Sequence, residues 1–261
     1  LTMTNNVYFS ANALKKNLHA ISNTLDDESF RRAIEGCLED IAPHIAQSPH
    51  IETIITEFFK DFPEGEKIST NILSFRNDAS RIKTTCYAIG EVIYNTGSVT
   101  AVQGSSQLFV DYRDTDFFED VVETVGATAS WASDAATVNA VVQTFNDYLG
   151  LNTAEDLVIA FQEMLRESTP NYTIQRVAES LSEDDVQESL EADCWGEGKH
   201  VAINAIWTTI NDTEEKTTGR VVAQTLKDYR GQPVLGKIAG LFVDVSYETE
   251  NPDLVKAVPK V

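Results

Sequence analysis

Hydrophobic residues between Ser10 and Asn95 recur at steps of three and four, the spacing that places side chains on one face of an α-helix. The run ends at Asn95-Thr96-Gly97, a common stop because glycine tolerates the left-handed conformation that follows many helices. Residues 1–97 are therefore predicted to form a bundle of about four helices, each burying one face against the others. The most regular stripe in this region comprises Ile72, Phe75, Ala79, Ile82, Cys86, Ile89 and Ile93.

The segment from Ser98 to Tyr112 has a different pattern. Two short runs, residues 99–102 and 107–110, contain valine, leucine and phenylalanine, and they flank Gly104-Ser105-Ser106. Small residues between two such runs favour a tight turn. The segment is therefore predicted to form a β-hairpin inserted into the helical region.

The helical period returns after Asp116 and continues through Leu190. Thr153 and Asp156 resemble a capping box, in which side chains satisfy the free backbone amides at a helix start. We therefore expect residues 98–195 to combine the hairpin with an acidic helical region. The clearest stripe here is formed by Trp131, Ala135, Val138, Val142, Phe145 and Leu149.

The last part of the chain is rich in β-branched residues and short alternations, which favour strands. The alternation is clearest after residue 240, where Leu241, Val243, Val245 and Tyr247 would share one face of a strand. Short connections exclude parallel crossovers and so indicate an antiparallel sheet in residues 196–261. The expected fold class is α+β: a helical bundle body with one inserted hairpin and a C-terminal antiparallel β-sheet, as one domain or several. The predicted strands are residues 200–210, 219–226, 234–238 and 241–249.

Charge is the most informative feature of the composition. The 261 residues include 41 acidic and 20 basic side chains, a net charge of −21, and residues 111–200 alone hold 20 acidic and 4 basic ones. Such a surface repels nucleic-acid phosphates and anionic lipid and attracts basic protein surfaces. The alternative is that the carboxylates only keep the protein soluble. The predicted interaction residues are Asp111, Asp114, Asp116, Glu119, Asp120, Glu183, Asp184 and Asp185.

The carboxylates between Asp111 and Asp120 are dense enough to suggest a calcium site. They lack the glycine and the ligand spacing of an EF-hand loop, however. Acidic residues are also favoured at a helix start, where they complement the helix dipole. We therefore predict no metal and no cofactor.

The most unusual local sequence is Asp193-Cys194-Trp195-Gly196-Glu197-Gly198-Lys199-His200. Cys194 with His200 would suit a thiol nucleophile and its base. Glu197 and Lys199, with Asp193 or Asp185, would suit a metal-dependent nuclease. We favour a third interpretation, a flexible turn anchored by Trp195, because no second motif supports catalysis. The candidate catalytic residues are Cys194, Glu197, Lys199 and His200.

Together these patterns favour a non-catalytic acidic interaction or assembly protein that binds a basic protein surface. They favour no direct nucleic-acid binding, no membrane association and no enzymatic role. The alternatives are a hydrolase or metal-dependent nuclease centred on the 193–200 junction and an inhibitor that mimics DNA with rows of carboxylates. Exposed edges of the C-terminal sheet would also permit a homo-oligomer. Three widely spaced cysteines, Cys37, Cys86 and Cys194, suit the cytoplasm or another reducing compartment.

Overall fold

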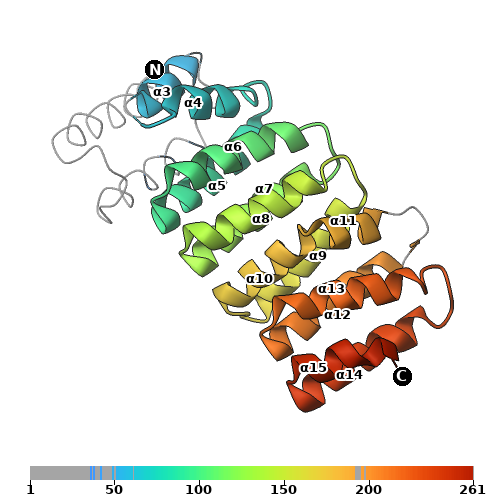
Figure 1. The fold of residues 1–261 in the computed structure, drawn as a ribbon. Coiled ribbons are helices and arrows are strands. Elements are labelled where there is room, and N and C mark those ends of the chain that lie inside the picture. Colours follow the sequence, from blue (N-terminus) through green and yellow to red (C-terminus); the bar gives the residue numbers. More distant parts are fainter. Residues whose placement is uncertain are drawn as a thin grey trace. The chain divides into compact units, whose positions relative to one another are not determined.

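The computed structural model of the chain is built from helices (Figure 1). It describes residues 51–60, 62–191, 195, 196 and 198–260, together with Gly36, Leu38, Ala42 and Pro49. Every regular element within these residues is a helix. The chain divides into two compact units, residues 1–142 and 143–261.

In the first unit, α4 and α5 each pack against the next helix and the one after it. Helix α4 contacts α3, α5 and α6, and α5 contacts α6 and α7. Neighbouring helices therefore stack in layers, as they do in helical repeat proteins. The helices that the structure describes over residues 51–142 are α3 (Ile51–Phe59), α4 (Gly65–Leu73), α5 (Ala79–Thr96), α6 (Val99–Tyr112), α7 (Phe118–Ala132) and the first part of α8 (Ala135–Asp147).

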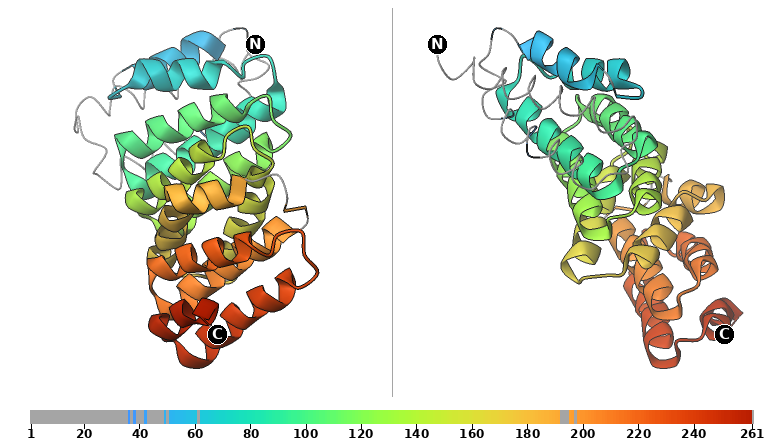
Figure 2. Two further views of the ribbon diagram at one scale, coloured as in Figure 1. Left: turned by 45° about the vertical axis from the view of Figure 1, so that its right-hand side comes forward. Right: turned by 90° about the vertical axis from the view of Figure 1, so that its left-hand side faces the viewer.

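The second unit is arranged in the same way around α12 (Figure 2). Helix α12 contacts α9, α10, α13 and α14, and α13 also contacts α10, α11 and α15. Tyr148, just after α8, donates a hydrogen bond of 2.7 Å to the Leu181 carbonyl and so fastens this end of α8 to α10. After α8, the elements are α9 (Thr153–Arg166), α10 (Asn171–Leu181), α11 (Asp184–Glu191), α12 (Gly198–Thr213), α13 (Lys216–Lys227), α14 (Leu235–Thr249), α15 (Pro252–Ala257) and the 3-10 turn η1 (Val258–Lys260).

The β-hairpin predicted for residues 98–112 is wrong, because this segment forms helix α6. Its first turn is capped by Ser98, whose Oγ accepts a hydrogen bond of 3.2 Å from the Ala101 amide. The small residues in the middle do not make a turn but face neighbouring helices. Asn71 of α4, for example, donates a hydrogen bond of 3.0 Å to the Ser106 hydroxyl. Small side chains here permit close helix packing.

The predicted C-terminal antiparallel sheet is also wrong, and with it the α+β fold class. The four predicted strands lie in α12, α13 and α14. In α14 the buried residues are Leu235, Ala239, Phe242 and Ser246, at the helical steps of four, three and four. The alternating set that suggested a strand includes Leu241 and Tyr247, whose exposed fractions are 44% and 76%. Strand propensity is a weak local preference, and packing of the helical stripe overrides it.

The helical prediction is confirmed for the described parts of the stripes before residue 190, except that the first and last residues of one stripe, Trp131 and Leu149, are exposed, and Leu149 lies after the end of α8. Helix α3 buries Ile54, Ile55, Phe58 and Phe59, and α5 ends at Gly97, whose φ is 57°. The stripes predicted before residue 50 lie outside the described residues, apart from the buried Leu38.

Two stripes that look continuous in sequence are each split by a capping residue. Asp78 separates α4 from α5 and accepts hydrogen bonds from the amides of Ser80 and Arg81. Asp134 separates α7 from α8 in the same way. A capping side chain lets a new helix start without losing the hydrophobic period.

Candidate functional site

The turn between α11 and α12 is anchored by Trp195, as one of the sequence interpretations expected. The side chain is 2% exposed, and its indole Nε1 donates a hydrogen bond of 2.8 Å to the Ser189 carbonyl. Gly196 follows with a φ of 52°, a backbone conformation that residues other than glycine rarely adopt. Trp195 therefore holds the start of α12 against the end of α11.

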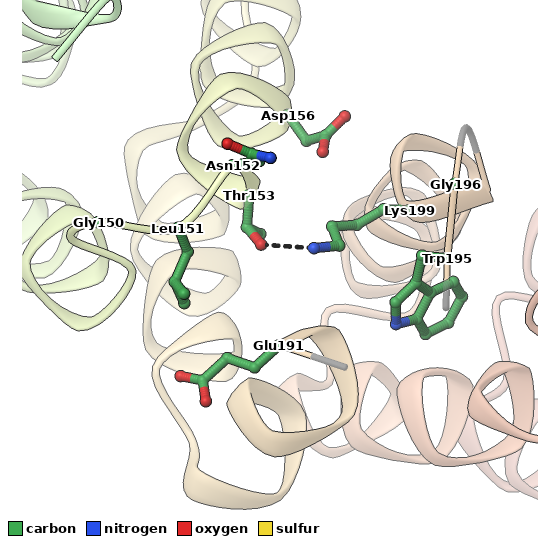
Figure 3. Close-up of a pocket in the computed structure, with 9 residues that line it drawn as sticks. All are labelled: Gly150, Leu151, Asn152, Thr153, Asp156, Glu191, Trp195, Gly196 and Lys199. Atoms are coloured by element: carbon green, nitrogen blue, oxygen red, sulfur yellow. Dashed lines mark hydrogen bonds between the residues drawn. The ribbon is translucent and has the colours of Figure 1, made fainter. Parts of the chain in front are cut away.

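A pocket of about 400 Å³ opens beside this turn, inside the second unit (Figure 3). It is bordered by the loop before α9, the first turn of α9, the end of α11 and the start of α12. At one side of it Lys199 Nζ donates a hydrogen bond of 2.8 Å to Thr153 Oγ1, which ties α12 to α9. The residues lining the pocket are Gly150, Leu151, Asn152, Thr153, Asp156, Glu191, Trp195, Gly196 and Lys199.

The pocket carries two carboxylates, Asp156 and Glu191, and one ammonium group, Lys199. Burial raises the pKa of Asp156 above its ordinary value, while the nearby His200 and Lys199 act in the opposite direction. The net effect is a carboxylate whose charged form is disfavoured in the folded protein. Carboxyl groups whose pKa is shifted by burial are more frequent in binding and catalytic sites than elsewhere.

This electrostatic arrangement predicts that Asp156→Asn stabilises the protein at neutral pH. A carboxyl group whose pKa is raised by folding opposes folding once the pH exceeds that pKa. We expect the variant to unfold at higher urea concentration than the wild type at about pH 7, with a difference that shrinks towards about pH 4 as the carboxylate becomes protonated. The control variant is Glu155→Gln, which removes the charge of the neighbouring exposed residue. A gain for Asp156→Asn that does not change with pH would contradict the assignment.

The predicted catalytic residues are only partly brought together. Lys199 lines the pocket, and His200 lies next to it in the first turn of α12, with a buried Nδ1 that has no hydrogen-bond partner in the described structure. Cys194 and Glu197, and also Asp193, lie outside the described residues. Within the described residues, no group of three His, Cys, Asp or Glu side chains is placed to hold a metal ion. Asp185, the other suggested metal ligand, instead pairs with Arg220 at 3.6 Å.

The sequence interpretation missed Thr153, Asp156 and Glu191 as pocket residues. Thr153 and Asp156 suggested a capping box, but the start of α9 has no such side-chain cap, and the Thr153 hydroxyl accepts a hydrogen bond from Lys199 instead. The two bonded residues are 46 positions apart in sequence. No local pattern could have paired them.

Five of the predicted interaction residues lie together in sequence around the connection from α6 to α7. We call them the acidic turn: Asp111, Asp114, Asp116, Glu119 and Asp120. All five are exposed. Their described contacts are slight: Asp111 accepts a hydrogen bond of 3.0 Å from Gln107, and Asp114 lies 3.5 Å from the exposed Arg113. Exposed pairs of this kind neutralise little charge.

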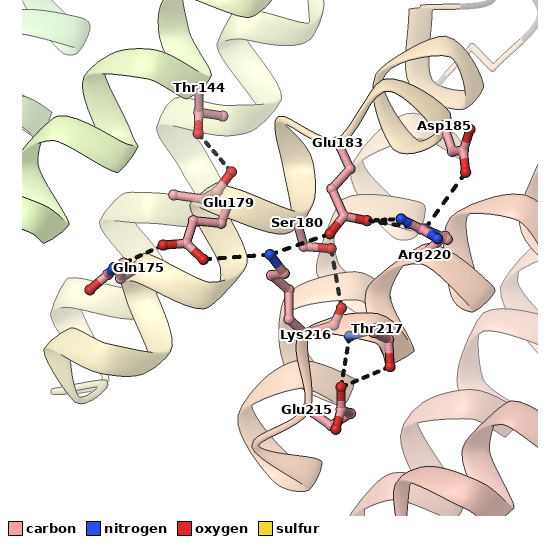
Figure 4. A network of polar contacts seen from close by, with 11 residues as sticks. Thr144, Gln175, Glu179, Ser180, Glu183, Asp185, Glu215, Lys216, Thr217 and Arg220 are labelled. Atoms are coloured by element: carbon pink, nitrogen blue, oxygen red, sulfur yellow. Dashed lines mark hydrogen bonds and ion pairs between the residues drawn. The ribbon is translucent and has the colours of Figure 1, made fainter.

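The second predicted group comprises Glu183, Asp184 and Asp185, and Figure 4 shows the surroundings of Glu183 and Asp185. Arg220 of α13 lies 3.1 Å from Glu183 and 3.6 Å from Asp185, and Lys216 lies 3.5 Å from Glu183. The Glu183 side chain is only 18% exposed. These contacts fasten α13 to α11 and the end of α10, so this group contributes to the packing of the second unit. Asp184 remains exposed.

Acidic side chains are shared almost equally between the two units. Residues 1–142 contain 20 acidic and 10 basic residues, and residues 143–261 contain 21 and 10. The acidic residues that are concentrated in the middle of the sequence therefore belong partly to one unit and partly to the other.

Cys86, the cysteine that the structure describes, is buried in α5. Burial raises the pKa of its thiol to about 12, which keeps it protonated and unreactive. It packs as a small hydrophobic residue, as its place on the helical stripe predicts. Cys37 and Cys194 lie outside the described residues.

Comparison with known proteins gives no further guide to this site. The chain matches no protein-family model, no curated protein and no solved structure. Among the described helices, none combines the length and the hydrophobicity needed to cross a lipid bilayer.

Proposed function

We propose that the protein is a non-catalytic interaction or assembly protein whose acidic turn binds a basic protein surface. The observation that carries the proposal is the contrast between its two acidic groups. Glu183 and Asp185 are paired with cations of α13, whereas the acidic turn exposes five carboxylates beside the exposed Arg113. A second arginine, Arg81, donates a hydrogen bond to the Arg113 carbonyl, but its ion pair is with Asp78, outside the acidic turn. Unneutralised carboxylates close together attract cationic side chains and accelerate association with them.

The stacked helices support this proposal. Helical layers of this kind present extended surfaces, and proteins built from them commonly serve as binding scaffolds. The acidic turn joins α6 and α7, two helices that pack against each other, and this packing fixes both ends of the connection. Less conformational entropy is then lost when a partner binds.

The test measures binding of a lysine- and arginine-rich peptide to the full chain by fluorescence anisotropy. The variant converts the acidic turn to amides through Asp111→Asn, Asp114→Asn, Asp116→Asn, Glu119→Gln and Asp120→Asn. Five lost pairings at about 0.2–1 kcal/mol each amount to about 1–5 kcal/mol, so affinity should fall by at least about fivefold and by up to almost four orders of magnitude. Wild-type affinity should also fall as the salt concentration rises from about 50 to about 500 mM.

A matched control separates the local surface from the overall charge. It makes the same change in net charge at five exposed acids of the second unit: Glu155→Gln, Glu167→Gln, Asp228→Asn, Glu248→Gln and Glu250→Gln. The control should lose no more than about threefold in affinity, since it alters only the long-range field. Equal losses of affinity in the two variants would mean that the net charge of the whole protein explains the binding. That result would refute a role for the acidic turn.

A further inference from the structure

The outer face of helix α14 carries charged, small and hydrophobic residues on one stripe. Its inner face is formed by Leu235, Ala239, Phe242 and Ser246, all buried, and the helix packs on α12, α13 and α15. On the opposite side, Lys237, Gly240, Leu241 and Asp244 recur at steps of three, one and three, which places them on one outward stripe. Figures 1 and 2 show no described helix of this unit covering α14 on its side away from α12.

The side chains on this stripe are available for contact. Lys237, Leu241 and Asp244 are exposed, with Leu241 at 44%, and Tyr247 one turn further along is 76% exposed. Neither Lys237 nor Asp244 forms an ion pair within the described structure. Large hydrophobic side chains of this exposure, close to charges without partners, are typical of a contact surface.

Gly240 is not required by the fold of the monomer. A Cβ atom at this position would meet nothing within 4 Å, and its φ is not positive. Glycine inside a helix is less stable than alanine by about 1 kcal/mol. The missing side chain leaves a gap on the outer face directly beside Leu241.

The stripe is complementary to itself. When two α14 helices lie antiparallel about a two-fold axis between Gly240 and Leu241, each Lys237 faces Asp244 of the other copy. The same axis places each Leu241 over the gap at Gly240 of the other copy. A two-fold interface requires this kind of self-complementary patch, with every contact made twice.

We propose that two copies of this chain associate through antiparallel α14 helices, with Leu241 packed over Gly240 and Lys237 paired with Asp244. This replaces the sheet edges that the sequence suggested for self-association. It is independent of the acidic turn, which lies in the other unit. One helix from each copy makes a small interface, so we expect a dissociation constant of about micromolar magnitude.

The experiment is sedimentation velocity of the full chain over a concentration series at about 150 mM salt, where repulsion between the two acidic copies is screened. The wild type should change from monomer to dimer with increasing concentration. Lys237→Asp and Asp244→Lys should each weaken the dimer by about tenfold or more, because like charges then face each other twice. Lys67→Asp on α4, which makes the same change in charge as Lys237→Asp, should leave the dimer unchanged.

Restoring the pairing provides the sharper test. Mixing Lys237→Asp with Asp244→Lys should yield a heterodimer of near wild-type affinity, and so should the double variant with itself, because the two-fold axis pairs opposite charges in both cases. A parallel arrangement, or docking on another protein, would restore neither.

A third variant, Gly240→Leu, fills the gap. It should abolish the dimer while its melting temperature at dilute concentration is retained or raised, since the new side chain meets nothing within the monomer. A wild type that stays monomeric at all concentrations would overturn the proposal. A dimer that persists unchanged in all three single variants would overturn it as well.

Discussion

Phe161→Ala is expected to lower the free energy of unfolding of the second unit by about 3–5 kcal/mol. Phe161 lies in α9 with 1% of its surface exposed, and its ring centroid is 5.7 Å from that of Phe145 in α8. Truncation removes hydrophobic surface from the core and leaves a cavity that the packed helices can only partly close. Urea unfolding followed by circular dichroism, with hydrogen exchange of α9 peptides, measures the loss.

The control for this prediction is Ile159→Ala, on the same helix. Ile159 is 37% exposed, so its truncation removes less buried surface and should cost less than about 1 kcal/mol. Similar losses for both variants would mean that α9 does not bury the face seen in the structure.

Gly219→Ala is the second change for which we expect a large effect, a destabilisation of about 1–3 kcal/mol. Helix α13 passes so close to its neighbours here that a Cβ atom would lie 2.5 Å from Ser180 Oγ, 2.7 Å from Ile210 Cδ1 and 3.2 Å from Ile206 Cγ2. The methyl group must push α13 away from α10 and α12, or force several side chains to move. Thermal and urea unfolding report the change.

The same substitution at Gly240 gives the matched comparison. Gly240 lies within α14, where an added methyl group has open space, so Gly240→Ala should stabilise the protein by up to about 1 kcal/mol through helix propensity alone. The two alanine variants should therefore differ in sign. If Gly219→Ala were also stabilising, the close packing of α13 described above would be incorrect.

The two acidic groups show why charge in a sequence does not translate directly into charge on a surface. Glu183 and Asp185 are as acidic in sequence as Asp114 and Asp116, and both pairs belong to the stretch of greatest charge density. Arg220, which neutralises Glu183 and Asp185, is more than 30 positions away from both of them. Which carboxylates remain free depends on which helix faces which.

Between residues 51 and 190, where the structure describes the chain almost without a gap, the hydrophobic pattern alone was sufficient to locate most helices. Steps of three and four identified the buried faces of α3 and α5, and Asn95-Thr96-Gly97 marked a helix end that the structure confirms. These features are local, because a residue's neighbours at three and four positions along the chain determine whether a helix can bury one face. The breaks at Asp78 and Asp134 were missed, since a capped restart preserves the period.

Other features depended on contacts between distant segments. The valine- and isoleucine-rich end of the chain favoured strands locally, but α12, α13 and α14 bury their stripes against one another, and the burial gained outweighs a preference of about 1 kcal/mol or less per residue. The pocket at Lys199 needs Thr153 from another helix, and the neutralisation of Glu183 needs Arg220 from α13. The sequence by itself therefore determined the overall acidity and helices such as α3 and α5. Only the tertiary structure decided the helical form of the described C-terminal residues, the pocket and the carboxylates left free, because each of these requires side chains far apart in the chain to meet.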